Sequence, residues 1–156
     1  MAHDFDYMSA GELRLRIARK DISPVELTRR ALERAEAVQA DLNPFFVMFP
    51  AEAMAAARAA EDEGMSGGAL GALHGLPMSV KDLISVGGAP FAFGSKVMAE
   101  NVALDDAPAV ERARAAGAIV IGKTTTSEFG CKPVGDSPLT GVTRNPWNRN
   151  KTPGGS

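Results

Sequence analysis

The chain has 156 residues, which is enough for one domain with a modest core. Its formal net charge of −2 argues against non-specific binding to nucleic acid, which needs an excess of basic residues on one face. The contents of 45% hydrophobic and 23% charged residues are ordinary for a soluble globular protein.

The N-terminus and the cysteine content predict a cytoplasmic protein. The first six residues carry two acids where a secretory signal would carry Lys or Arg. No apolar run approaches the roughly 18 residues of a membrane span, so we expect no membrane segment. Cys131 is the single cysteine and cannot form an internal disulfide, which indicates a reducing compartment. We expect it to be a buried, inert thiol.

The first third of the chain predicts two helices with clear starts. Ser9 and Glu12 have the spacing of a capping box, in which each side chain accepts a hydrogen bond from the backbone of the other. Ser23 followed by Pro24 is a stronger signal, with serine as N-cap and proline at the first helical position. The second helix is expected to run to about residue 40.

A strand, a helix and a loop follow. Residues 45–49 are short, apolar and aromatic, which favours a buried strand. Residues 51–63 are rich in alanine and predict a helix. Residues 64–75 hold five glycines and are interpreted as a loop.

The next segments alternate in the same way. Residues 78–80 predict a strand that enters a catalytic loop, and residues 86–95 predict an irregular, closely packed loop. A helix should begin at residues 106–108 and end at Gly117, a glycine at the C′ position. Residues 118–121 are expected to form a short buried strand.

The last segment, residues 122–156, is rich in glycine and proline and predicts loops without regular structure. A tail of that length is unusual in a complete domain, so we interpret it as active-site loops that pack against a continuing chain. The alternation of helices with short apolar strands predicts an α/β fold with parallel or mixed strand pairing.

Residues 117–124, GAIVIGKT, match the phosphate-loop pattern G-x-x-x-x-G-K-[ST]. A phosphate loop needs a strand before the first glycine and a helix after the lysine. Here a helix is expected before the glycine, and the four middle residues are apolar and β-prone. We therefore interpret the segment as a helix end followed by a strand, without nucleotide binding.

Six sequence blocks from residue 75 onward occur in the order GLPMSVKDLISVGG, FGS, GAIVIGKT, EFG, TRNPWN and TPGGS. Their order and spacing resemble the amidase signature family, the Ser-cisSer-Lys hydrolases of amides. The resemblance implies an incomplete amidase-signature fold, with N-terminal helices followed by part of a mixed β-sheet core flanked by helices. It also implies a single incomplete domain, in which residues 1–64 are mainly helical and residues 65–156 start the amidase core.

The same resemblance assigns the site residues. It makes Lys81 the catalytic lysine and Ser156 the middle serine, which carries the cis peptide. Asp82, Gly154 and Gly155 then support the loops that hold these two side chains. The family nucleophile and its oxyanion-hole amides lie further along than residue 156, so we expect the 156 residues by themselves to be inactive.

The chemistry explains these residue types. A serine hydroxyl is a poor nucleophile until a base takes its proton. Lysine is a base only when neutral, and burial disfavours its charged form. Leu76, Met78, Val80 and Leu83 are expected to supply apolar surroundings. A bridging serine can accept a proton from the nucleophile while passing its own to Lys81, and glycines permit the tight turn that such a relay needs.

Other polar residues carry weaker signals. Asp82 is expected either to orient the lysine loop by hydrogen bonds or to cap a turn. Thr125 stands where the family commonly has asparagine, which leaves a role for that side chain open. His3 and His74 have no companion ligands at metal-binding spacing, so no metal is expected, and the resemblance implies no cofactor.

The first functional hypothesis is that the chain is the N-terminal segment of an amidase. The whole enzyme would hydrolyse a small-molecule carboxylic amide to acid and ammonia or amine, without binding nucleic acid directly. One alternative is a non-catalytic structural or binding module from a truncated gene, which would form a homo-oligomer to cover exposed apolar surface. Another alternative is the amidase subunit of a tRNA-dependent amidotransferase, which has protein partners.

Overall fold

The computed structural model describes residues 5–155, and its first two helices begin at capping serines. α1 (Ala10–Ala18) follows Ser9, whose N–H donates to the Glu12 carboxylate at 2.9 Å while its hydroxyl accepts from the Glu12 N–H. α2 (Pro24–Leu42) follows Ser23, whose hydroxyl accepts from two amides of the first turn. Both predicted helix starts are confirmed, because each depends only on groups within one turn.

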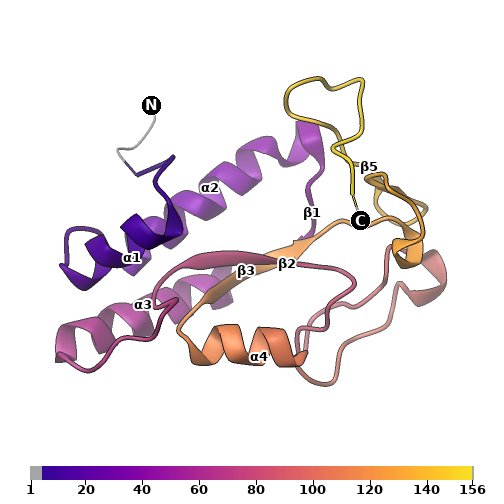
Figure 1. The fold of residues 1–156 in the computed structure, drawn as a ribbon. Helices are drawn as coiled ribbons and strands as arrows, with labels where there is room; N and C mark the ends of the chain where they lie inside the picture. Colours follow the sequence, from indigo (N-terminus) through magenta and orange to yellow (C-terminus); the bar gives the residue numbers. More distant parts are fainter. Residues whose placement is uncertain (1–4, 156) are drawn as a thin grey trace.

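Three strands form a mixed sheet. β1 (Phe45–Met48), β3 (Ile119–Thr124) and β2 (Pro77–Lys81) lie in the order β1-β3-β2. β1 is antiparallel to β3, whereas β2 is parallel to it. The mixed pairing confirms the α/β class, and the parallel register brings the end of β2 beside the end of β3 (Figure 1).

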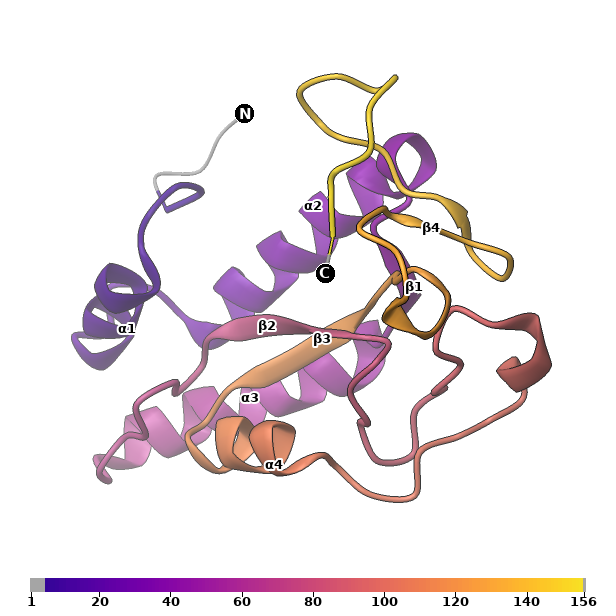
Figure 2. The same ribbon diagram turned by 45° about the vertical axis from the view of Figure 1, so that its right-hand side comes forward.

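Helices cover both faces of this sheet. α2 and α3 (Pro50–Ser66) pack on one face, and α4 (Pro108–Ala115) packs on the other (Figures 1 and 2). The core of the first face includes Leu32, Ala57 and Ile119. The core of the second face includes Val80, Val110 and Val120. Within residues 5–155, no helix is both long enough and apolar enough to cross a membrane.

Two loop predictions need correction. α3 continues through Gly64 to Ser66, so the loop begins only at Gly67, which ends the helix in the left-handed conformation with φ +81°. The expectation that residues 122–156 lack regular structure is also wrong in part. β3 extends to Thr124, and β4 (Asp136–Ser137) pairs with β5 (Gly141–Val142) in a short antiparallel hairpin. Short 3₁₀ turns lie at Lys96–Met98 and Glu128–Gly130.

The segment that matches a phosphate loop is a strand. α4 ends just before Gly117, which adopts φ +92° as expected for a C′ glycine. A Cβ at this position would lie 2.6 Å from the His74 Cα, so glycine is required for space as well as for conformation. The next residues form β3, and this confirms the interpretation as helix end and strand.

Candidate active site

Lys81 is the last residue of β2 and lies beside Thr124 of β3. The two strands remain joined beyond this pair, because the Asp82 N–H donates to the Thr124 carbonyl at 3.1 Å. Successive side chains of a strand point to opposite faces, so Lys81 and Asp82 diverge. Lys81 lines a cavity of ≈ 230 Å³, whereas Asp82 is fully buried on the other side of the sheet.

The wall of this cavity is rich in hydroxyl groups. It includes the last residue of β3, the three residues that follow this strand and the residue that follows β5: Thr124, Thr125, Thr126, Ser127 and Thr143. The Thr125 and Thr143 hydroxyls lie 2.6 Å apart and hydrogen-bond to each other. Among the described lining residues, Lys81 is the single side chain with an ammonium, carboxylate, imidazole or thiol group. The described lining of the cavity therefore combines one amine with a row of hydroxyl groups.

The C-terminal segment closes over the same cavity. Gly154 and Gly155 both line it, and Gly154 has a left-handed φ of +85°. The Thr152 hydroxyl accepts from the Gly135 amide at 3.1 Å and from the Gly154 amide at 3.2 Å, which fixes the returning chain. Figure 2 shows this yellow segment arriving near the ends of β1 and β3. The structure thus brings Lys81, Gly154 and Gly155 together, while Ser156 lies outside the described residues.

Asp82 has a different environment. Its two carboxylate oxygens accept from the Ala92 amide at 3.2 Å and the Gly94 amide at 3.0 Å. The Lys123 ammonium lies 3.0 Å from the same carboxylate. The bonds run to a loop ten and twelve residues away, so the geometry is that of an anchor for residues 90–94 and not of a local turn cap.

Lys123 is a buried cation that the sequence analysis did not single out. Its side chain is 0% exposed, its Nζ donates to the Pro90 carbonyl at 2.7 Å, and it lies 4.6 Å from the centre of the Phe91 ring. Burial lowers the pKa of Lys123, and the hydrogen bond and charge of Asp82 oppose this shift. The available signal was a lysine two residues beyond the predicted apolar strand at 118–121, since a buried lysine requires a partner.

An irregularity in the β2–β3 ladder sets the direction of Lys123. Met78 pairs with Val120, but the next pair is Ser79 with Gly122, so β3 holds one extra residue, Ile121. The shifted register pairs Val80 with Lys123 and directs both side chains to the α4 side of the sheet. The two lysines on neighbouring strands consequently face opposite sides.

Comparison with known proteins identifies the family. The sequence profile of the amidases matches residues 26–156. The chain belongs to the amidase family. It is 39% identical to an acylamidase of Rhodococcus erythropolis over 96% of the chain and 31% of that relative. It is 40% identical to a glutamyl-tRNA(Gln) amidotransferase subunit of Geobacter metallireducens over 93% of the chain and 30% of that relative.

A solved structure supports the same assignment. The native peptide amidase of Stenotrophomonas maltophilia superposes with a TM-score of 0.89 and 30% identity. The match covers 98% of this amidase chain and 33% of that structure. The chain therefore spans about 30% of the length of the curated relatives it matches.

Two expectations for the predicted site are wrong. Three of the four apolar neighbours expected around Lys81 lie elsewhere, because Met78 and Val80 point toward α4 and Leu76 packs in the N-terminal core with α1 and α2. Cys131 is exposed and not buried. The first error comes from treating proximity in sequence as proximity in space, which strand alternation overrules.

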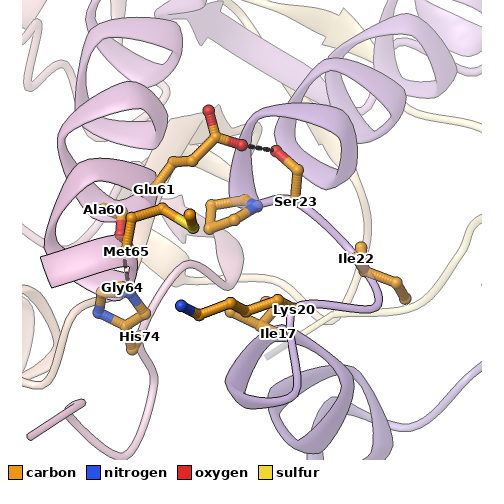
Figure 3. Close-up of a pocket in the computed structure, with 10 residues that line it drawn as sticks. Ile17, Lys20, Ile22, Ser23, Ala60, Glu61, Gly64, Met65 and His74 are labelled. Carbon is orange, nitrogen blue, oxygen red and sulfur yellow. Dashed lines mark hydrogen bonds between the residues drawn. The ribbon is translucent and has the colours of Figure 1, made fainter. Parts of the chain in front are cut away.

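A second cavity of ≈ 120 Å³ lies between the first three helices of the amidase chain, away from Lys81 (Figure 3). The Ser23 hydroxyl donates to the Glu61 carboxylate, and the His74 Nε2 bonds the Ala60 carbonyl at 2.9 Å. Its polar side chains are thus engaged in structural contacts, although Lys20 points toward His74 (Figure 3). The described part of the chain holds no cluster of three metal-ligating side chains, and His3 lies outside it.

Proposed function

We propose that these residues form the N-terminal part of an enzyme that hydrolyses a small-molecule carboxylic amide to a carboxylate and ammonia or an amine. The observation that carries the proposal is the shared cavity, in which Lys81, the single amine among the described lining residues, meets the Gly154-Gly155 turn. Membership of the amidase family and the similarity to an acylamidase support it. We also propose one incomplete domain, with residues 1–64 and 65–156 as its two parts.

In the proposed mechanism, Lys81 is the terminal base. Its neutral Nζ accepts the proton of the Ser156 hydroxyl while that hydroxyl accepts the proton of the nucleophilic serine, which the family resemblance places further along the chain. The nucleophile adds to the amide carbonyl, and the relay then returns a proton to the departing nitrogen. Water releases the acyl group from the serine as carboxylate by the same proton path.

The surrounding residues shape this relay. Gly154 holds a left-handed conformation, so the chain turns sharply before Ser156. Asp82 anchors the loop that follows β2 and so fixes the position of the strand end that carries Lys81. The hydroxyl groups of Thr124 to Ser127 give the cavity a polar surface, to which the described lining adds no charged side chain besides Lys81.

The test uses the full-length protein that contains this chain. We expect it to release ammonia from benzamide, or p-nitroaniline from p-nitroacetanilide, together with the matching acid. Lys81→Ala should lower the release by about 10²–10⁴-fold while the fold persists. A serine-directed fluorophosphonate should label the full-length protein but not the 156-residue chain. Undiminished turnover by Lys81→Ala would refute the assignment of the base.

A second candidate is the amidase subunit of a tRNA-dependent amidotransferase, favoured by the 40% identity to a glutamyl-tRNA(Gln) amidotransferase subunit. The two functions separate in one experiment. Hydrolysis of free amides by the purified protein without partners favours the free-standing amidase. Amide hydrolysis that requires added partner proteins and glutamyl-tRNA(Gln) favours the amidotransferase.

A further inference from the structure

A buried carboxylate directly after Lys81 raises an electrostatic problem for a lysine that acts as a base. Asp82 is 0% exposed and is held by two backbone amides. A negative charge nearby favours the ammonium form of lysine, which cannot accept a proton. At an effective dielectric constant of about 20, one unit charge at about 10 Å moves a protonation equilibrium by roughly one pH unit.

Lys123 supplies the compensating charge on the far side of the sheet. Its ammonium lies 3.0 Å from the Asp82 carboxylate, and both side chains are within 1% of complete burial. Lys123 cannot be the base itself, because it does not line the Lys81 cavity and its Nζ is engaged by Asp82 and the Pro90 carbonyl.

Among the described residues that surround the Asp82–Lys123 pair and the Lys81 cavity, we find no other charged side chain that would compensate Asp82 or act on Lys81. The loop that packs over Lys123 contributes backbone groups and the Phe91 ring, and Glu128 beside it bonds the Ser95 hydroxyl at 2.8 Å. On α4, the charged residues Glu111, Arg112 and Arg114 are exposed. The described wall of the Lys81 cavity offers no second ionisable side chain.

We propose that Lys123 is a positioning residue for amide hydrolysis, whose ammonium neutralises Asp82 so that this carboxylate can anchor residues 90–94 without holding Lys81 in its protonated form. The inference rests on the proposed function, in which Lys81 is the base. A purely structural ion pair would also tie the loop to the strands, but it would not control the protonation of Lys81. The two roles differ in how activity depends on pH.

The experiment measures the pH dependence of kcat/KM for the full-length protein with p-nitroacetanilide, which carries no group that titrates in the assay range. The acid limb of this profile reports the ionisation of the essential base in the free enzyme. Lys123→Met leaves the Asp82 charge uncompensated, so the acid limb of its kcat/KM profile should lie about one pH unit higher than that of the wild type. At pH values below this limb, kcat/KM should be about tenfold lower than in the wild type. Asp82→Asn removes the negative charge, so its limb should not rise.

Two further variants are controls. Lys123→Arg keeps the positive charge and should keep the wild-type limb. Lys96→Met removes one lysine charge from an exposed side chain on the 3₁₀ turn after the same loop, and should also leave the limb in place. Circular dichroism establishes that each variant is folded. If Lys123→Met does not fold, the limb of Asp82→Asn must lie below that of Asp82→Asn/Lys123→Met.

The outcomes separate the inference from the proposed function. A raised limb in Lys123→Met without a raised limb in Asp82→Asn supports the inference. The inference is overturned if the acid limb of Lys123→Met does not move, or if the limb rises in both Lys123→Met and Asp82→Asn. It is also overturned if Asp82→Asn and Asp82→Asn/Lys123→Met have equal limbs. Absence of Lys81-dependent hydrolysis in the wild-type protein would instead refute the proposed function.

Discussion

The Asp82–Lys123 pair should contribute strongly to stability, and Lys123→Met tests this. The substitution keeps most of the volume of the side chain but removes the ammonium. It leaves a fully buried carboxylate without its counter-ion, and it leaves the Pro90 carbonyl without its 2.7 Å donor. Breaking a buried ion pair in this way costs about 3–5 kcal/mol. For a chain of this size, that corresponds to a fall in Tm of roughly 6–20 °C.

The assay is urea denaturation followed by circular dichroism, carried out as a double-mutant cycle. We expect Asp82→Asn and Lys123→Met to be non-additive by at least about 2 kcal/mol, because the double variant contains no unpaired buried charge. The exposed Lys96→Met should change the free energy of unfolding by less than about 0.5 kcal/mol. A loss below about 1 kcal/mol in Lys123→Met would refute the conclusion that this pair is buried and coupled.

Three further predictions follow from local geometry. Gly117→Ala combines a left-handed φ with a 2.6 Å approach to backbone and should cost about 2–4 kcal/mol in urea denaturation. A Cβ at Gly154 would meet open space, but the residue has a φ of +85°. In Gly154→Ala, kcat/KM of the full-length protein should therefore fall tenfold or more with little change in Tm. The control Gly68→Ala, which also has open space, should alter neither quantity. Hydrogen bonds from Ser9 hold the pKa of Glu12 below its ordinary 4.5. The folded-state pKa is depressed, so the ionised Glu12 stabilises α1 above pH 4.5, and this stabilisation is lost as the pH falls through the lowered pKa. In Ser9→Ala, circular dichroism should therefore show a smaller loss of helix content on acidification.

The elements that could be predicted from the sequence are those fixed by local interactions. The starts of α1 and α2 depend on serines that bond amides within the same turn. Gly117 marks a helix end because glycine adopts a left-handed conformation without penalty. The six ordered sequence blocks identified the family, and the structure brings four of them to one cavity, through Lys81, Thr124, Thr143 and Gly154.

The parts that could not be predicted depend on register between distant segments. One extra residue at Ile121 decides which face of the sheet Lys123 occupies, and no feature of the β3 sequence alone reveals that shift. The polar wall of the Lys81 cavity comes from the end of β3, the residues after it and the residue after β5, which meet β2 only in the folded chain. The β4–β5 hairpin was missed because each strand is two residues long and shows no alternation.

The catalytic role of Lys81 is tested most directly by kcat/KM for amide hydrolysis by full-length Lys81→Ala, measured together with its free energy of unfolding. We predict a loss of about 10²–10⁴-fold, the usual contribution of a positioned base, with stability close to that of the wild type. A variant that stays folded and retains wild-type kcat/KM would contradict the claim that Lys81 is the base in this cavity.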